Sequence, residues 1–201
     1  MSIKNVVFDF GQVLVHFEPR YMVSVYVENE EDIDLLERVV FDRLYWDRLD
    51  EGTITDEETV RLCKARLPQR LHNVAEKIYY NWIYNIPEFA GMREIVLWLK
   101  DKGVKLCLLS NISKYFAEHA SEIPILSLIE NKVMSGPIGI VKPSYEIFDH
   151  LCKSFDLDPK ETLFVDDNEA NIKGATSYGI NTYRFDFDVE KLKKYLESII
   201  K

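Results

Sequence analysis

Two apolar β-type segments that each end in carboxylates constrain this chain more than any other feature. Residues 6–8 lead into Asp9, and residues 163–165 lead into Asp166 and Asp167. In open parallel α/β sheets, ligands bind in the crevice outside the carboxyl ends of the strands. Carboxylates gathered in a poorly hydrated crevice repel one another unless a cation lies among them. The pattern therefore predicts an acidic site at the edge of a sheet, with a divalent metal bound in it.

Composition limits the partners that such a chain can have. The 201 residues are 47% hydrophobic, which suits one domain with an insertion or two small domains. A formal net charge of -9 argues against a nucleic-acid or anionic-membrane surface. Three widely spaced cysteines, Cys63, Cys107 and Cys152, lie in apolar contexts and are expected to be buried thiols. We expect a cytoplasmic protein, monomeric or homodimeric, without a membrane segment.

The chain divides into a helical stretch and an alternating stretch. Between the first strand and Gly91 the apolar spacing is helical, and Thr55 to Glu58 forms a capping box. After Gly91, strands predicted near residues 104–109, 133–134, 162–165 and 181–185 alternate with helices. The expected fold is α/β, a Rossmann-like and mostly parallel sheet flanked by helices, with an α-helical cap inserted after strand one. The predicted domains are a core of residues 1–16 and 90–201 and a cap of residues 17–89.

Four short motifs follow one another along the predicted sheet. They are Asp9, Ser110-Asn111, Lys142-Pro143 and Asp166-Asp167. In order, spacing and strand placement they resemble the four motifs of the haloacid dehalogenase-like hydrolase superfamily. The resemblance covers nearly the whole chain and is greatest to small sugar-phosphate phosphatases related to the N-terminal phosphatase domain of soluble epoxide hydrolase.

The resemblance implies a Mg²⁺-dependent phosphomonoester hydrolase. Its substrate would be a small phosphorylated metabolite such as a sugar phosphate, and its intermediate an aspartyl phosphate. Asp9 would be the nucleophile. Mg²⁺ would be held by Asp9, Asp167 and the Gly11 carbonyl, with Asp166 supporting this shell or binding the metal through water.

The two middle motifs would bind the phosphoryl group. The resemblance implies that Ser110 donates a hydrogen bond to it through the hydroxyl, and Asn111 through its backbone or amide. Lys142 would offset the negative charge that develops between Asp9 and the phosphoryl oxygens, which stabilises an anionic transition state.

Gly11 departs from the family pattern. Most phosphatases that the chain resembles have an aspartate two residues after the nucleophile, which protonates the leaving alcohol and then activates water. General acid-base catalysis contributes roughly 10²- to 10⁴-fold, so either another group replaces this aspartate or turnover is slow. His16, Glu18 and Asp47 are the candidates that the sequence offers.

The predicted cap carries side chains suited to a sugar or leaving group. Arg43, Trp46, Tyr45 and Arg48 are plausible substrate contacts, although the two aromatic residues fit a core position equally well.

Two other functions remain open at this point. A metal-independent 2-haloacid dehalogenase shares the superfamily and also lacks the second aspartate, but Asp166 and Asp167 beside Asp9 would repel a carboxylate substrate. A weakly active or degenerate homologue that acts as a binding or regulatory protein is compatible with Gly11. The presence of Asp9, Lys142 and Asp167 argues against it.

Overall fold

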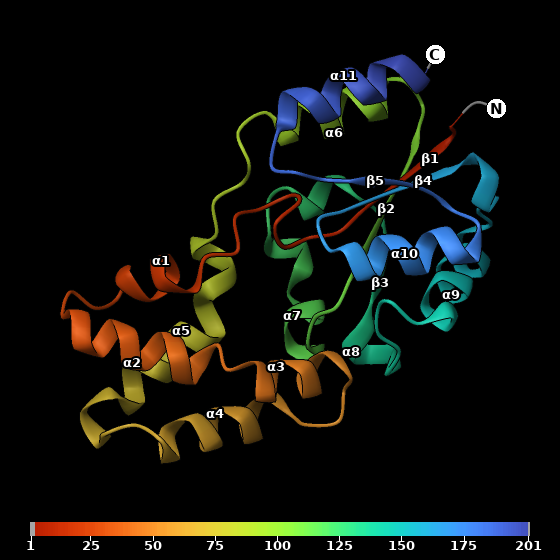
Figure 1. Cartoon of the computed structure of the whole chain (residues 1–201). Helices are drawn as coiled ribbons and strands as arrows, with labels where there is room; N and C mark the ends of the chain where they lie inside the picture. Colours follow the sequence, from red (N-terminus) through yellow and green to blue (C-terminus); the bar gives the residue numbers. More distant parts are fainter. Residues whose placement is uncertain (1–2, 201) are drawn as a thin grey trace.

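A five-stranded parallel sheet forms the centre of the molecule in the computed structural model, which describes residues 3–200 (Figure 1). The strands are β1 (Asn5–Phe8), β2 (Lys105–Ser110), β3 (Asn131–Met134), β4 (Thr162–Asp166) and β5 (Asn181–Arg184). Their order is β3-β2-β1-β4-β5, and every neighbouring pair is parallel. The predicted Rossmann-like fold is thus confirmed. Residues 1, 2 and 201 of the predicted core domain lie outside the described residues.

The strand order places the site. The chain builds β2 and β3 on one side of β1 and then returns to place β4 and β5 on the other side. The switch in direction lies between β1 and β4, and a crevice opens at the carboxyl ends of such a pair. Asp9 follows β1 directly and Asp166 ends β4, so the fold brings together two carboxylates that are far apart in the sequence.

Alternating side chains of β1 enter two separate cores. Val6 and Phe8 face the layer that contains α6 (Met92–Asp101) and α11 (Val189–Ile199). Val7 faces the layer that contains α9 (Tyr145–Phe155) and α10 (Glu169–Tyr178). Figure 1 shows α6 beside α11 on one side of the sheet, with α9 and α10 on the other. Burial on both faces explains why the strands read as continuous apolar runs.

The strands lie close to their predicted positions, whereas several helices were not predicted. One of these is α11, which follows the predicted strand near residues 181–185 and buries Leu192 and Leu196. The segment between β2 and β4 also contains short helices that were not predicted. These are α7 (Lys114–Glu118), η3 (Ala120–Glu122), η4 (Leu126–Leu128), α8 (Ser135–Ile138) and η5 (Pro159–Glu161). Helices this short carry too little periodicity to be distinguished from loops.

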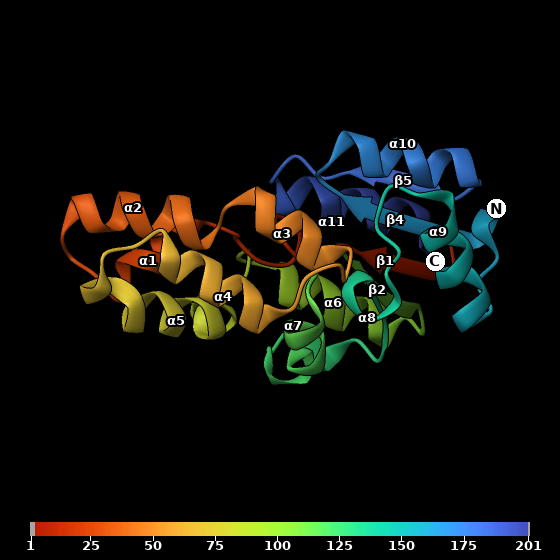
Figure 2. The same ribbon diagram turned by 90° about the horizontal axis from the view of Figure 1, so that it is seen from below.

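A helical insert, residues 17–89, separates β1 from α6. It contains α1 (Pro19–Ser24), α2 (Glu30–Val40), α3 (Arg43–Asp50), α4 (Asp56–Ala65), η1 (Gln69–Leu71), α5 (His72–Asn81) and η2 (Trp82–Asn85). The side chains of Asn29 and Thr55 accept backbone N–H bonds at the starts of α2 and α4. The Thr55 bond is one half of the predicted capping box, whereas the Glu58 side chain pairs with Arg61. Figure 2 shows the insert extending to one side of the sheet layers, with α3 nearest to them.

Two neighbouring chain segments connect the insert to the sheet. The His16 N–H donates to the Pro87 carbonyl at 2.8 Å, and the Phe89 N–H donates to the Leu14 carbonyl at 3.2 Å. The segments that enter and leave the insert therefore run side by side as a hydrogen-bonded pair.

A buried carboxylate on α4 holds the insert against the segment that follows β2. Asp56 accepts hydrogen bonds from the Tyr79 and Ser113 hydroxyls, both at 2.7 Å, and from the Tyr115 N–H at 3.3 Å. Nearby, the turn at Gly52 meets the start of α8 so closely that a Cβ on Gly52 would lie 2.6 Å from the Gly136 carbonyl oxygen. The turn at Gly52 therefore has no space for a side chain against the start of α8.

The cysteine prediction is confirmed. Cys63, Cys107 and Cys152 are free and buried, and burial raises the pKa of each thiol. Such thiols stay protonated and unreactive at neutral pH. Within residues 3–200, no helix has the length and apolar character that crossing a bilayer requires.

Candidate active site

Lys142 lies at the centre of the acidic crevice. Its ammonium is 2.7 Å from Asp9 Oδ1 and 2.9 Å from Asp166 Oδ2, and its side chain is almost fully buried. Burial alone would lower the pKa of Lys142, but the charges and hydrogen bonds of Asp9 and Asp166 outweigh that effect and raise it. The lysine is therefore a fixed positive charge between two strand ends.

Asp166 is held in place by groups around it. Asn171, one turn into α10, donates its amide to both carboxylate oxygens, and the Asn168 N–H donates to Oδ1 at 2.8 Å. With Lys142 on Oδ2, this completely buried carboxylate has a partner on each oxygen. Asp166 positions Lys142, and Asn171 orients Asp166.

Asn111 has a different contact from those that the sequence suggested. Its amide donates to the Lys142 carbonyl at 3.1 Å, and its side-chain oxygen accepts from the Lys142 N–H at 2.8 Å. Both ends of the side-chain amide are thus bound to the backbone of Lys142, so of the two donors predicted for Asn111 the amide is already occupied. Ser110, at the end of β2, lines the same cavity.

The acidic side chains fit a divalent metal. Asp9, Asp166 and Asp167 each offer a carboxylate oxygen within 4.8 Å of the others. Burial, and then the charge of Asp166, raises the pKa of Asp167, and burial raises that of Asp9 against the opposing effect of Lys142. A cation would relieve these costs. Because Asp166 is already bonded on both oxygens, Asp9 and Asp167 are the side chains best placed to bind the hard, oxygen-preferring Mg²⁺.

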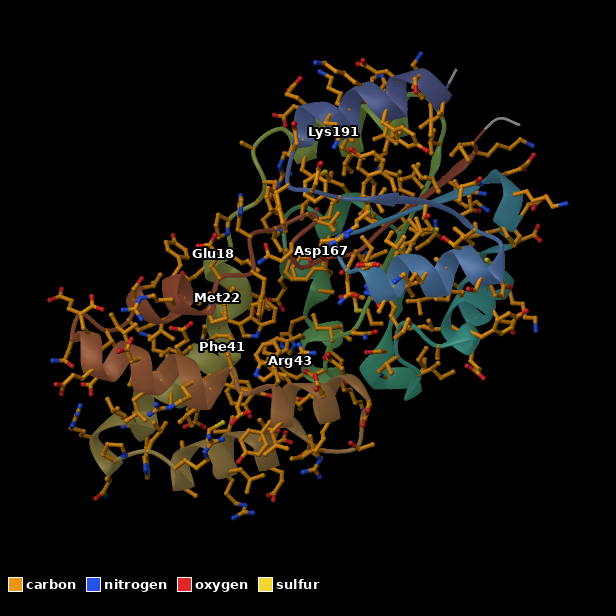
Figure 3. All side chains as sticks on the ribbon, in the orientation of Figure 1. Glu18, Met22, Phe41, Arg43, Asp167 and Lys191 are labelled. Atoms are coloured by element: carbon orange, nitrogen blue, oxygen red, sulfur yellow. The ribbon has the colours of Figure 1, made fainter. Side chains whose placement is uncertain are left out.

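A cavity of about 320 Å³ opens over this charged floor. It lies between the carboxyl ends of the strands and the insert, within the size range of small-molecule sites. The floor provides Asp9, Gly11, Lys142 and Asp167, and Figure 3 shows Arg43 on the insert across the junction from Asp167.

Aromatic rings form one wall of the cavity. Trp46 and Trp82 from the insert lie with ring centroids 5.5 Å apart, and Phe17 packs on Trp82 at 5.4 Å. Of the four predicted cap contacts, Arg43 and Trp46 line the cavity, whereas Tyr45 and Arg48 do not. Trp46 is also a core residue, since its indole N–H donates to the Val40 carbonyl and its side chain is buried.

The three acid-base candidates that the sequence offered do not line the cavity. His16 stacks on Phe89 with ring centroids 3.6 Å apart, beside a different hollow of the surface. Glu18 is 62% exposed, and Asp47 is exposed and paired with Arg43. The structure therefore does not support these three assignments.

Asp50 is a cavity residue that the sequence analysis missed. It is the last residue of α3 and is buried, and its side chain has no hydrogen bond or ion pair with any residue from 3 to 200. Burial raises the pKa of Asp50 to about 7, in spite of the opposing charge of Arg43. Nothing in the local sequence distinguishes it from the exposed acids around it, because its burial depends on how α3 packs against the sheet.

Comparison with known proteins agrees with this geometry. A family model for haloacid dehalogenase-like hydrolases matches residues 3–179. The chain belongs to this family. The resemblance seen in the four motifs is therefore confirmed, and the haloacid dehalogenase-like chain is a hydrolase.

Two phosphatases are similar in sequence to this chain over most of its length. A D-ribitol-5-phosphate phosphatase from Bacteroides thetaiotaomicron is 28% identical, over 90% of this chain and 91% of the relative. A sesquiterpene phosphatase from Aspergillus oryzae is 23% identical, over 89% of this chain and 88% of the relative. Both relatives are phosphatases by name.

Solved structures share the fold. A haloacid dehalogenase family enzyme from Bacteroides thetaiotaomicron, in complex with magnesium and inorganic phosphate, has a TM-score of 0.67 at 21% identity, over 90% of this chain and 93% of that one. A dehalogenase with an intermediate complex has a TM-score of 0.74 at 18% identity, over 100% of this chain and 98% of that one. Since both kinds of enzyme share the fold, the fold alone does not select the reaction.

Proposed function

We propose that this haloacid dehalogenase-like hydrolase is a Mg²⁺-dependent phosphatase that hydrolyses a small phosphorylated metabolite through an aspartyl phosphate. Residues 1–16 and 90–201 would form the catalytic core domain, and the helical insert would form a cap domain over it. The observation that carries the proposal is the ion pair between Lys142 and Asp9 at 2.7 Å, beside Asp167, at the switch point of the sheet.

The residues of the chain have distinct tasks in this reaction. Asp9 attacks phosphorus and forms the covalent intermediate, because one of its carboxylate oxygens is fixed by the Phe10 N–H at 2.7 Å and by Lys142. Ser110 and the Asn111 N–H bind phosphoryl oxygens. Lys142 offsets the negative charge between the attacking carboxylate and the phosphoryl group, where a preorganised cation contributes most.

Asp9, Asp167 and the Gly11 carbonyl would hold Mg²⁺. The bound ion would supply positive charge that draws the phosphoryl group toward Asp9 and stabilises its transition state. Asp166 would support the site from below by keeping Lys142 in place.

The cavity favours a polar organic substrate. Its volume of about 320 Å³ accommodates a small phosphate ester, and its wall combines the aromatic rings of Trp46 and Trp82 with the charged groups of Arg43 and Asp50. Rings that pack on C–H surfaces beside charged hydrogen-bonding groups suit a sugar or polyol. The D-ribitol-5-phosphate phosphatase relative supports the same class of substrate.

The test is release of inorganic phosphate from a panel of sugar and polyol phosphates, with ribitol 5-phosphate included, at saturating Mg²⁺. We expect activity on part of the panel, its loss with EDTA and its return with added Mg²⁺. Asp9→Asn should lower kcat by at least about 10³-fold with an unchanged circular dichroism spectrum, because the amide is a poor nucleophile. Asp101→Asn, on the exposed end of α6, is the matched control.

The same assay separates the alternative functions. Halide release from a 2-haloacid in the presence of EDTA would identify a dehalogenase. Saturable binding of phosphate esters without any turnover would identify a degenerate homologue that acts as a binding protein. Full activity of Asp9→Asn would contradict the proposed nucleophile.

A further inference from the structure

Hydrolysis of an alkyl phosphate needs a proton to be moved twice. The leaving alkoxide must gain a proton, and the water that attacks the aspartyl phosphate must lose one. Gly11 has no side chain that could do either. Lys142 is bound to both Asp9 and Asp166, and Asp166 is bound to Lys142 and Asn171. Asp9 is the proposed nucleophile and Asp167 a proposed metal ligand, so no carboxylate of the floor is left for this task.

Asp50 lines the cavity from the side of the insert, facing the floor. It lines the same cavity as Asp9 and Lys142, and it is about 8% exposed. A buried carboxylate usually has a partner, because leaving it unpaired is costly. No such partner exists within residues 3–200, so the side chain remains available to the substrate and to water.

We propose that Asp50 is the general acid and base of this enzyme, supplied by the helical insert in place of a side chain at position 11. The inference rests on the proposed phosphatase function and names a further catalytic residue for it.

The two half-reactions balance at this carboxyl group. In the first, an oxygen of Asp9 bonds to phosphorus, the bond from phosphorus to the leaving oxygen breaks, and protonated Asp50 gives its proton to that oxygen. In the second, water attacks phosphorus, ionised Asp50 accepts a proton from this water, and the bond from phosphorus to Asp9 breaks. Inorganic phosphate leaves, and Asp50 is protonated again.

The charges around Asp50 allow both protonation states near neutral pH. Burial disfavours its charged form, as do Asp47 on the same helix and Asp9 after β1. Arg43, at the first position of α3, and Lys142, on the side of the sheet, favour the charged form. A carboxyl group poised between these influences can act as an acid in one step and a base in the next.

The experiment compares Asp50→Asn with wild type on two substrates. One is the best alkyl phosphate found in the substrate panel, and the other is p-nitrophenyl phosphate, whose leaving group needs no proton. Glu51→Gln is the matched control, because it removes an adjacent but exposed acid at the same helix end.

We expect Asp50→Asn to lower kcat on the alkyl phosphate by about 10²-fold or more. On p-nitrophenyl phosphate, rapid mixing should show a burst of nitrophenol approaching one per active site, followed by slow turnover, because only dephosphorylation needs the base. The pH dependence of kcat should flatten in the same variant. Wild type and Glu51→Gln should show no burst and should share one pH profile.

Two results would overturn the inference in different ways. If Asp50→Asn raises KM for the alkyl phosphate, leaves kcat unchanged and shows no burst, then Asp50 binds substrate hydroxyls and is not the acid or base. If wild type releases no phosphate from either substrate, the proposed function fails first and the inference falls with it.

Discussion

The charged groups on the two sides of the cavity differ in how they are paired. One side is the floor at the carboxyl ends of the strands, and the other is the insert wall, the part of the cavity lining that the insert contributes. On the floor, Lys142 pairs with Asp9 and Asp166, and Asn171 completes the bonding of Asp166. On the insert wall, Arg43 pairs with exposed Asp47, while buried Asp50 has no partner within residues 3–200. The floor is therefore organised before any ligand arrives, whereas the wall leaves a carboxyl group for the ligand to complete. A hydrolytic site needs preorganised groups at the place where charge develops in the transition state. It also needs an unpaired titratable group at the place where protons are transferred.

Lys142→Ala should break the floor and give the largest effect on stability. It leaves Asp166 buried without its cation, and removing one partner of a buried pair costs about 3–5 kcal/mol. We expect this loss in urea unfolding at pH 8, and a large fall in kcat for the protein that remains folded by circular dichroism. Lys102→Ala, at an exposed position after α6, should change neither quantity. Wild-type kcat in Lys142→Ala would show that the floor does not need this charge.

Asp50→Asn should make the protein more stable while making it less active. Because burial raises the pKa of Asp50 from near 3.8 to about 7, the folded state is penalised once Asp50 ionises. The penalty is absent below the unfolded pKa, grows as pH rises between the two pKa values, and is complete above 7.

The variant should therefore exceed wild type in free energy of unfolding by up to about 4 kcal/mol at pH 8, with no difference near pH 4. Urea unfolding in the presence of EDTA measures this. If the free energies of unfolding of variant and wild type differed equally at both pH values, or if the variant were less stable at pH 8, then Asp50 would have a charged partner, as the carboxylates of the floor do.

Gly11→Ala should give the smallest effect. Gly11 does not have a left-handed φ, and an added Cβ would lie 3.6 Å from the Phe17 Cβ, an ordinary contact. We expect kcat within about threefold of wild type and a change in unfolding free energy within about 1 kcal/mol. A larger loss of activity would show that catalysis requires the absence of a side chain at position 11.

The floor was largely predictable from the sequence, and the wall was not. Asp9, Ser110, Lys142 and Asp167 each follow a strand or precede a helix in a short local motif, and parallel strands bring such motifs to one edge. The aromatic wall was predicted in part, through Trp46.

Asp50 could not be found in this way, because its burial arises from tertiary packing of α3 against the sheet side rather than from local pattern. His16 and Glu18 were attractive because they lie close to Gly11 in sequence. Phe17 does line the cavity, but His16 stacks on Phe89 and Glu18 is exposed to solvent. Residues close to Gly11 in sequence are therefore not necessarily directed into the cavity.

The Asp56 hydrogen bonds have a mechanical consequence. They fasten the start of α4 to Ser113 and Tyr115, so this part of the insert is held close to the segment that follows β2. When one part of a molecule rocks against another, residues near such an attachment are displaced less than distant residues. Asp50 is separated from Asp56 only by the turn at residues 51–55, whereas α1 and α2 lie at the far end of the insert (Figure 1). In any rocking of the insert, Asp50 would thus be displaced less than α1 and α2, which keeps the proposed acid-base group close to the charged floor of the cavity.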